Sequence, residues 1–97
     1  MRLTNAEREG FLTDHPLWKI EGEETTRTFV LDGFAQAIAF VTECSFAAEA
    51  ADHHPDIDIR WNKVTMKLTT HSETALTAKD AGLAEAFDVI ASRVASR

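Results

Sequence analysis

The segment from Phe34 to Ala51 constrains the fold of this chain of 97 residues more than any other. Its apolar side chains recur at helical spacing and form a stripe of Phe34, Ala37, Val41, Cys44 and Ala48. Ile38, Phe40 and Phe46 spread the apolar surface well beyond that stripe. Because a helix that is apolar around much of its circumference is buried on more than one side, we expect a long helix covered partly by another subunit, and therefore a homo-oligomer.

Strand-like segments stand in pairs before and after this helix. Leu17–Glu21 and Thr26–Leu31 are rich in β-branched and aromatic residues and enclose a polar turn, which predicts a hairpin. After the helix, apolar residues alternate with polar ones at Ile57, Ile59 and Trp61, and again at Val64, Met66 and Leu68. Asn62 is the expected turn residue of this second hairpin, because asparagine tolerates left-handed backbone geometry.

Two further helices complete the predicted order of elements. Thr4 to Glu7 has the form of a capping box and predicts a short helix to about Thr13. Thr77 to Asp80 has the same form and begins a final helix with an apolar face of Leu83, Ala84, Phe87, Ile90 and Ala91. The order α-β-β-α-β-β-α predicts an α+β fold, in which a four-stranded antiparallel sheet carries three helices on one face. We expect residues 1–97 to form one domain.

Composition limits the partners and the location of the chain. Lys and Arg number 10 and Asp and Glu number 16, so the net charge is −6, and we expect no direct binding to nucleic acid. The N-terminal residues do not resemble a signal peptide and no apolar run is long enough to span a bilayer, so we expect a cytoplasmic protein without membrane contact. Cys44 is the only cysteine, which is typical of a small buried side chain in a reducing compartment.

The stretch EAADHHPDID, from Glu49 to Asp58, gathers acids and a pair of histidines around one proline. Pro55 disfavours helical geometry at the residue before it, so His53 and His54 lie where the long helix gives way to a strand. His71 follows the second hairpin, which returns the chain to the same end of the sheet. Glu49 lies one helical turn before His53 and is expected to share its helix face, and Asp52 adjoins the histidine pair.

Three imidazoles with neighbouring acids suit a reaction in which one group takes a proton and another gives one. Imidazole titrates near pH ~6.5, and a carboxylate can orient the ring. Two other interpretations are weaker: a favourable interaction of His53 with the helix dipole, and a metal site of two histidines and a carboxylate. Adjacent histidines are awkward joint ligands, so we expect no metal. Asp80 is interpreted as a capping-box acid and His15 as a structural residue.

The motifs EAADHHPD, NKV-x-M-x-L-TTH and LT-x-K-D-x-x-LA together resemble the pterin-4a-carbinolamine dehydratases. The likeness extends upstream through Trp18, the segment from Arg27 to Phe29, and F-x-x-A-x-x-F from Phe34 to Phe40. It implies dehydration of 4a-hydroxytetrahydropterin to quinonoid dihydropterin, which recycles the pterin of an aromatic amino acid hydroxylase. It also implies no metal or organic cofactor, and assembly as a dimer or tetramer.

The resemblance also implies roles for individual residues. His53 and His71 match the proton-transfer groups, and His54 matches a pterin-binding residue that assists catalysis. Glu49 and Asp52 match acids that orient the histidines or hydrogen-bond the pterin. The residues that flank His71 match a substrate-contacting segment, namely Thr69, Thr70 and Ser72.

The chain departs from the family pattern at two positions. Ile57 stands where an aromatic residue is common, and Ala75 stands where glycine is common. If that glycine serves a positive φ angle, Ala75 implies an altered turn beside the site. Some relatives of the fold are partner-binding or assembly proteins, including a dimerisation cofactor of a homeodomain transcription factor, which leaves a non-catalytic role as the alternative. The presence of all three histidines favours the enzyme.

Overall fold

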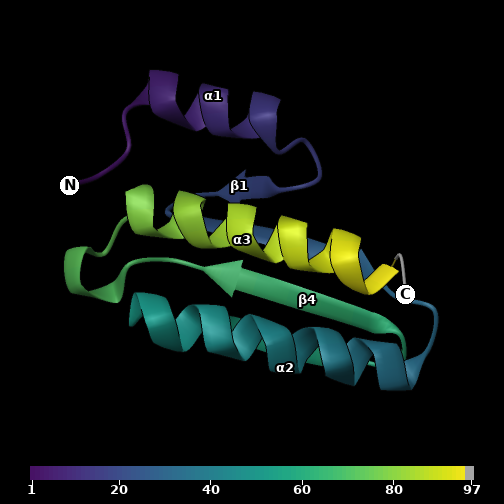
Figure 1. Ribbon diagram of the computed structural model, residues 1–97. Helices are drawn as coiled ribbons and strands as arrows, with labels where there is room; N and C mark the ends of the chain where they lie inside the picture. The colour runs from purple at the N-terminus through teal and green to yellow at the C-terminus, as the bar shows by residue number, and fades with distance from the viewer. Residues whose placement is uncertain (96–97) are drawn as a thin grey trace.

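The computed structural model describes residues 1–95 and confirms the predicted order of elements (Figure 1). The helices are α1 (Asn5–Asp14), α2 (Phe34–Ala51) and α3 (Ala78–Ala95), and a short 3-10 helix, η1, spans His71–Glu73. The strands are β1 (Lys19–Glu21), β2 (Glu24–Val30), β3 (Asp56–Arg60) and β4 (Lys63–Leu68). The first strand begins later than predicted because Trp18 still belongs to a turn, in which its backbone N–H donates to the carbonyl of His15 at 3.1 Å.

The four strands form one antiparallel sheet in the order β1-β2-β4-β3. Both predicted hairpins are present, and β4 pairs with β2 in the centre, so β3 is left as an edge strand. In the register, Leu68 at the end of β4 lies opposite Thr25 near the start of β2. The chain that follows β4 therefore emerges beside the turn between β1 and β2, which decides the neighbours of His71.

The core lies between one face of the sheet and the helices, as predicted. Figure 1 shows α2 and α3 in front of the sheet, packed against each other. Their buried side chains form one cluster with the inward side chains of β2 and β4, which include Phe29, Phe40, Val64, Met66, Leu68 and Phe87. Helix α1 joins the same cluster through Phe11, whose ring centroid lies 6.4 Å from that of Trp18. No helix of residues 1–95 is both long enough and apolar enough to cross a membrane.

A polar cluster around Asp88 fixes α1 and β2 to α3. One carboxylate oxygen, Oδ1, accepts hydrogen bonds from Trp18 Nε1 at 2.8 Å and from an Arg27 guanidinium nitrogen at 2.6 Å. The other oxygen, Oδ2, lies 3.1 Å from His15 Nδ1. The guanidinium of Arg27 also lies over the ring of Phe29, 4.1 Å from its centroid. These contacts agree with the interpretation of His15 as a structural residue.

The turn between β3 and β4 differs from the prediction in one respect. Asn62 lies in the turn, but the left-handed residue is Trp61, with a φ angle of 54°. The expectation of left-handed geometry at Asn62 was wrong because this residue is bound on both sides to Leu31. Its side-chain amide donates to the Leu31 carbonyl at 3.0 Å, and its carbonyl accepts from the Leu31 N–H at 2.8 Å. The chain reversal therefore falls on Trp61, which is a costly conformation for an aromatic residue.

Cys44 is a buried part of α2, and burial raises the pKa of its thiol from 9.0 to about 12. This difference lowers the thiolate fraction at neutral pH by a factor on the order of 10³, and the thiolate is the reactive form. We expect an aromatic disulfide reagent to modify the native protein far more slowly than the urea-unfolded chain, as followed by absorbance. A Cys44→Ala variant gives the reagent baseline. Rapid stoichiometric modification of the native protein would contradict the buried position.

Candidate active site

Helix α2 ends in a left-handed cap that turns the histidine pair out of the helix. Asp52 has a φ angle of 49° and its N–H donates to the Glu49 carbonyl at 3.1 Å. The N–H of His53 donates to the Ala48 carbonyl, also at 3.1 Å, which satisfies carbonyls that the helix end leaves without partners. Because His53 lies beyond this cap, it does not continue the helix face on which Glu49 lies.

His53 binds an acid from the start of α3. Its Nε2 lies 2.5 Å from Asp80 Oδ1, and the Asp80 side chain is 1% exposed. The other carboxylate oxygen of Asp80 accepts from the Thr70 hydroxyl at 2.8 Å and from the Thr77 backbone N–H at 2.9 Å. Asp80 therefore has the capping role that the sequence predicted, and it also fixes the ring of His53. Sequence reasoning missed this second contact, although Asp80 stands in the LT-x-K-D motif.

His54 binds a different acid, at the surface. Its Nε2 lies 2.7 Å from Glu49 Oε1, and both side chains are mostly exposed. The expectation that Glu49 would face His53 was wrong, because the left-handed cap at Asp52 brings His54 back over the last turn of α2. An exposed pair of this kind contributes about 0–1 kcal/mol to stability. Within residues 1–95, no group of three His, Cys, Asp or Glu side chains is arranged to hold a metal ion.

The three histidines that the sequence singled out line one pocket of about 220 Å³. Its walls come from the end of α2, the end of β4 and the start of α3, and consist of Asp52, His53, His54, Thr69, Thr70, His71, Ser72 and Lys79. The pocket thus holds every predicted site residue except Glu49, which reaches it only through His54. Lys79 is an addition that sequence reasoning missed. Thr70 is buried and its hydroxyl donates to Asp80, so this residue both lines the pocket and holds the Asp80 carboxylate in place.

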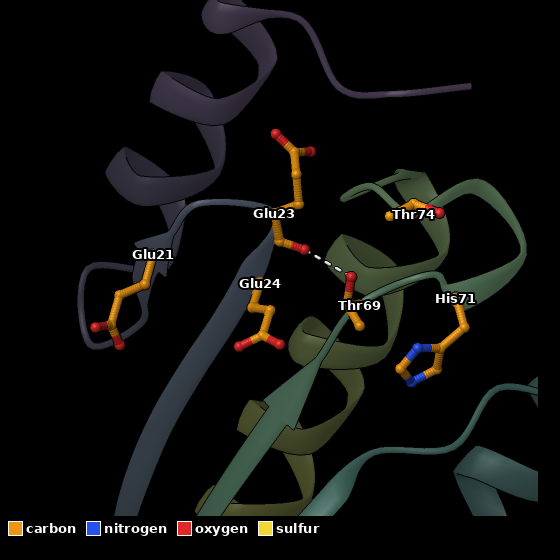
Figure 2. Close-up of a pocket in the computed structure, with 6 residues that line it drawn as sticks. All are labelled: Glu21, Glu23, Glu24, Thr69, His71 and Thr74. Carbon is orange, nitrogen blue, oxygen red and sulfur yellow. Dashed lines mark hydrogen bonds between the residues drawn. The ribbon is translucent and has the colours of Figure 1, made fainter.

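A second, larger hollow of about 390 Å³ adjoins this pocket and shares Thr69 and His71 with it (Figure 2). Its other lining residues are Glu21, Glu23, Glu24 and Thr74. Glu21 ends β1, Glu23 lies in the turn and Glu24 begins β2. The sheet register places this end of the hairpin beside the end of β4. Nothing in the sequence linked these residues to the histidines, because the contact depends on the pairing of β2 with β4.

Ala75 and Ile57, the two departures from the family pattern, show no strained backbone angle. Ala75 is buried and its φ angle is not positive; the left-handed residue of this turn is Thr74, with a φ angle of 52°. Ile57 is 40% exposed and lines a small pocket of about 140 Å³ together with His54 and Pro55. Neither residue contacts the pair of His53 and Asp80 through a hydrogen bond.

Comparison with known proteins agrees with these features. The family model described as Pterin 4 alpha carbinolamine dehydratase matches residues 1–90. The chain belongs to this family. A protein of Chloroflexus aurantiacus with the provisional name pterin-4-alpha-carbinolamine dehydratase is 54% identical over 89 residues, which cover 92% of this chain and 96% of that protein.

Two solved structures resemble the fold of this family member. A Brucella melitensis protein described as a transcriptional coactivator/pterin dehydratase superposes with a TM-score of 0.90 at 33% identity, over 94% of this chain and 99% of its own. A pterin dehydratase-like protein identified as a RuBisCO assembly factor in the alpha-carboxysome superposes with a TM-score of 0.64 at 19% identity. This second match covers 76% of this chain and 86% of the other, and it shows a shared fold only.

The contrast between the two His–acid pairs predicts different costs of removing each acid. Asp80→Ala removes the buried acceptor shared by the Thr70 hydroxyl and the Thr77 backbone N–H, and it leaves His53 without its acid, so we expect it to lower the free energy of unfolding by roughly 3–5 kcal/mol. Glu49→Ala breaks only the exposed pair and should cost less than about 1 kcal/mol. Urea unfolding followed by circular dichroism measures both. Equal effects of the two substitutions would contradict the central position of Asp80.

Proposed function

We propose that this protein dehydrates 4a-hydroxytetrahydropterin to quinonoid dihydropterin and water by histidine acid/base catalysis. The observation that carries the proposal is the meeting of His53 and His71 in one pocket, from elements far apart in the chain. Family membership supports a pterin carbinolamine as the substrate. The reaction needs a proton donor and a proton acceptor on one small molecule, and two imidazoles at the rim of one pocket can provide both.

The proposed reaction transfers two protons and breaks two bonds of the substrate, the C4a–O bond and one ring N–H bond. A protonated imidazole gives its proton to the 4a-hydroxyl, the C4a–O bond breaks with its electron pair on oxygen, and water leaves. A neutral imidazole takes the proton of a ring N–H, and the electron pair of that N–H bond restores the conjugation of the ring. The substrate loses one water in total, and no oxidant or reductant takes part.

The hydrogen bonds of the pocket support separate roles for its residues. Asp80 binds Nε2 of His53 and holds the ring in place, so Nδ1 is the nitrogen available for proton exchange with the substrate. The imidazole of His71 forms no hydrogen bond within residues 1–95, and we assign it the complementary proton transfer. We assign pterin binding to His54, held by Glu49, and to Asp52, Thr69, Thr70 and Ser72.

The proposed activity places the protein next to an aromatic amino acid hydroxylase, whose reaction forms such a carbinolamine. The product must then be reduced before the hydroxylase can use it again. If the folded protein does not accelerate the reaction, a binding or assembly role becomes the better interpretation, and the description of the Brucella melitensis relative as a coactivator favours that alternative.

The first test is turnover of 4a-hydroxytetrahydropterin, generated in situ, by protein from which metals have been stripped. We expect quinonoid dihydropterin to form faster than in the spontaneous reaction, as followed by absorbance. His53→Ala should lose turnover by roughly 10²–10⁴-fold because His53 transfers a proton, and it should remain folded because His53 lies beyond the end of α2 and outside the core cluster.

Two further variants separate catalysis from folding. His53→Gln can retain a hydrogen bond to Asp80 but cannot exchange a proton at neutral pH, so it should be as inactive as His53→Ala and closer to wild type in stability. His15→Gln alters a histidine outside the pocket and should keep the turnover of the folded protein. Full activity of His53→Gln would overturn the assignment of His53 as a proton-transfer group.

We also propose that the chain assembles as a dimer or tetramer through α2 and the edge strand β3. Large apolar side chains of these elements and of the following turn are exposed, namely Phe34, Ile38, Phe46, Ile57, Ile59 and Trp61. The outer edge of β3 also presents backbone N–H and C=O groups that the sheet does not pair. An apolar helix surface next to an open sheet edge is suited to a second copy of the same chain.

Substitution on α2 tests this assembly. Phe46 is 69% exposed on the side of α2 away from the core, so Phe46→Asp should reduce the molar mass in solution without unfolding the subunit. Light scattering after size-exclusion chromatography measures the mass. Val89→Asp, at a half-exposed apolar position of α3, is the matched control and should leave the mass unchanged. A monomeric wild-type protein at micromolar concentration would contradict the proposal.

A further inference from the structure

The hollow beside the histidine pocket is placed to receive the part of a substrate that extends beyond the pterin ring. In Figure 2, Glu21 and Glu24 lie on one side of Thr69, and His71 lies on its other side. Since Thr69 and His71 also line the histidine pocket, the two spaces meet at His71. The volume of the hollow, about 390 Å³, exceeds that of the pocket, so a substituent on the ring has room there.

The bonding of the pterin ring places its usual substituent close to the reacting carbon. The reacting carbon, C4a, must lie within reach of His53 and His71 for either imidazole to exchange a proton with it or its neighbours. The usual substituent of a pterin is carried by C6, and only N5 separates C6 from C4a. A substituent at C6 therefore begins close to His71, where the two spaces meet.

The three glutamates that line the hollow differ in how many partners their carboxylates have. Glu23 is held by the structure: its carboxylate accepts from the Leu76 backbone N–H at 3.1 Å and lies 3.4 Å from Arg8 and 3.5 Å from Arg2. Glu24 has only Lys67, at 3.6 Å, in an exposed pair. The carboxylate of Glu21 forms no hydrogen bond or ion pair within residues 1–95. Glu21 and Glu24 thus supply negative charge that nearby cations balance only in part.

We propose that Glu21 and Glu24 make the enzyme selective for the charge of the substituent at C6. A neutral, hydroxylated substituent is accepted in the hollow, whereas one that ends in a carboxylate or phosphate is disfavoured by repulsion. This inference rests on the proposed dehydratase activity and names its substrate class more closely. Charge repulsion at a wet surface is modest, so we expect a discrimination of roughly 5- to 30-fold in kcat/KM.

The test compares two 4a-hydroxytetrahydropterins whose C6 side chains have the same length and end in a primary amide or in a carboxylate. We expect the wild-type protein to favour the amide by roughly 5- to 30-fold in kcat/KM at low ionic strength. Because exposed charges are screened by salt, the ratio should fall as the ionic strength is raised towards ~0.5 M. A steric cause would not respond to salt in this way.

Substitutions test whether Glu21 and Glu24 cause the preference for the neutral substituent. In Glu21→Gln/Glu24→Gln the ratio should fall towards one, mainly through faster turnover of the carboxylate. Glu9→Gln/Glu85→Gln removes the same amount of charge from exposed positions outside the hollow and should keep the wild-type ratio. A ratio near one in the wild-type protein, or a ratio that neither salt nor the first variant changes, would overturn the inference alone. Absence of turnover with either pterin would instead overturn the proposed function, and the inference with it.

Discussion

The buried carboxylate of Asp80 is the interaction on which the site depends. It joins three parts of the chain: the first turn of α3, Thr70 in the segment that follows β4, and His53 beyond α2. A carboxylate that is 1% exposed is tolerated only when hydrogen bonds replace the water that it has lost. Each of its partners is therefore held in position as strictly as Asp80 itself, which fixes the His53 ring at the wall of the pocket.

Backbone geometry at two helix ends brings the remaining histidines to the same pocket. The left-handed cap at Asp52 ends α2 early enough for His54 to fold back onto Glu49, and Pro55 then starts the extended chain. On the other side, β4 returns antiparallel to β3, and the left-handed residue Thr74 closes the short turn that holds His71. Neither left-handed residue is itself a histidine, yet Asp52 sets the direction of the His54 ring and Thr74 that of the His71 ring.

Local patterns in the sequence were sufficient for the fold but only partly sufficient for the site. Helical and strand periodicity predicted the three α-helices and the four strands, because each depends on residues close together in the chain, but not the short 3-10 helix η1. The meeting of His53 with His71 also followed, since a hairpin returns the chain to its starting level. Local patterns could not predict contacts between side chains of different elements. The contact of His53 with Asp80, for example, depends on the packing of α2 against α3. The glutamates beside Thr69 likewise depend on the register of β2 against β4.

Helix α3 carries two acids that each bind a histidine, and the two acids differ in their other partners. Asp88 also binds the guanidinium of Arg27, which stays charged at any pH that the fold survives, so its charge is balanced whether or not His15 is protonated. The other partners of Asp80 within hydrogen-bonding distance are a hydroxyl and a backbone N–H, both neutral. Among the hydrogen-bond partners of Asp80 within residues 1–95, His53 is thus the one whose side chain is able to carry a positive charge. The same pairing of residue types therefore has different surroundings within one helix: the pair at Asp88 also holds an arginine, whereas the pair at Asp80 places a histidine on the wall of the pocket.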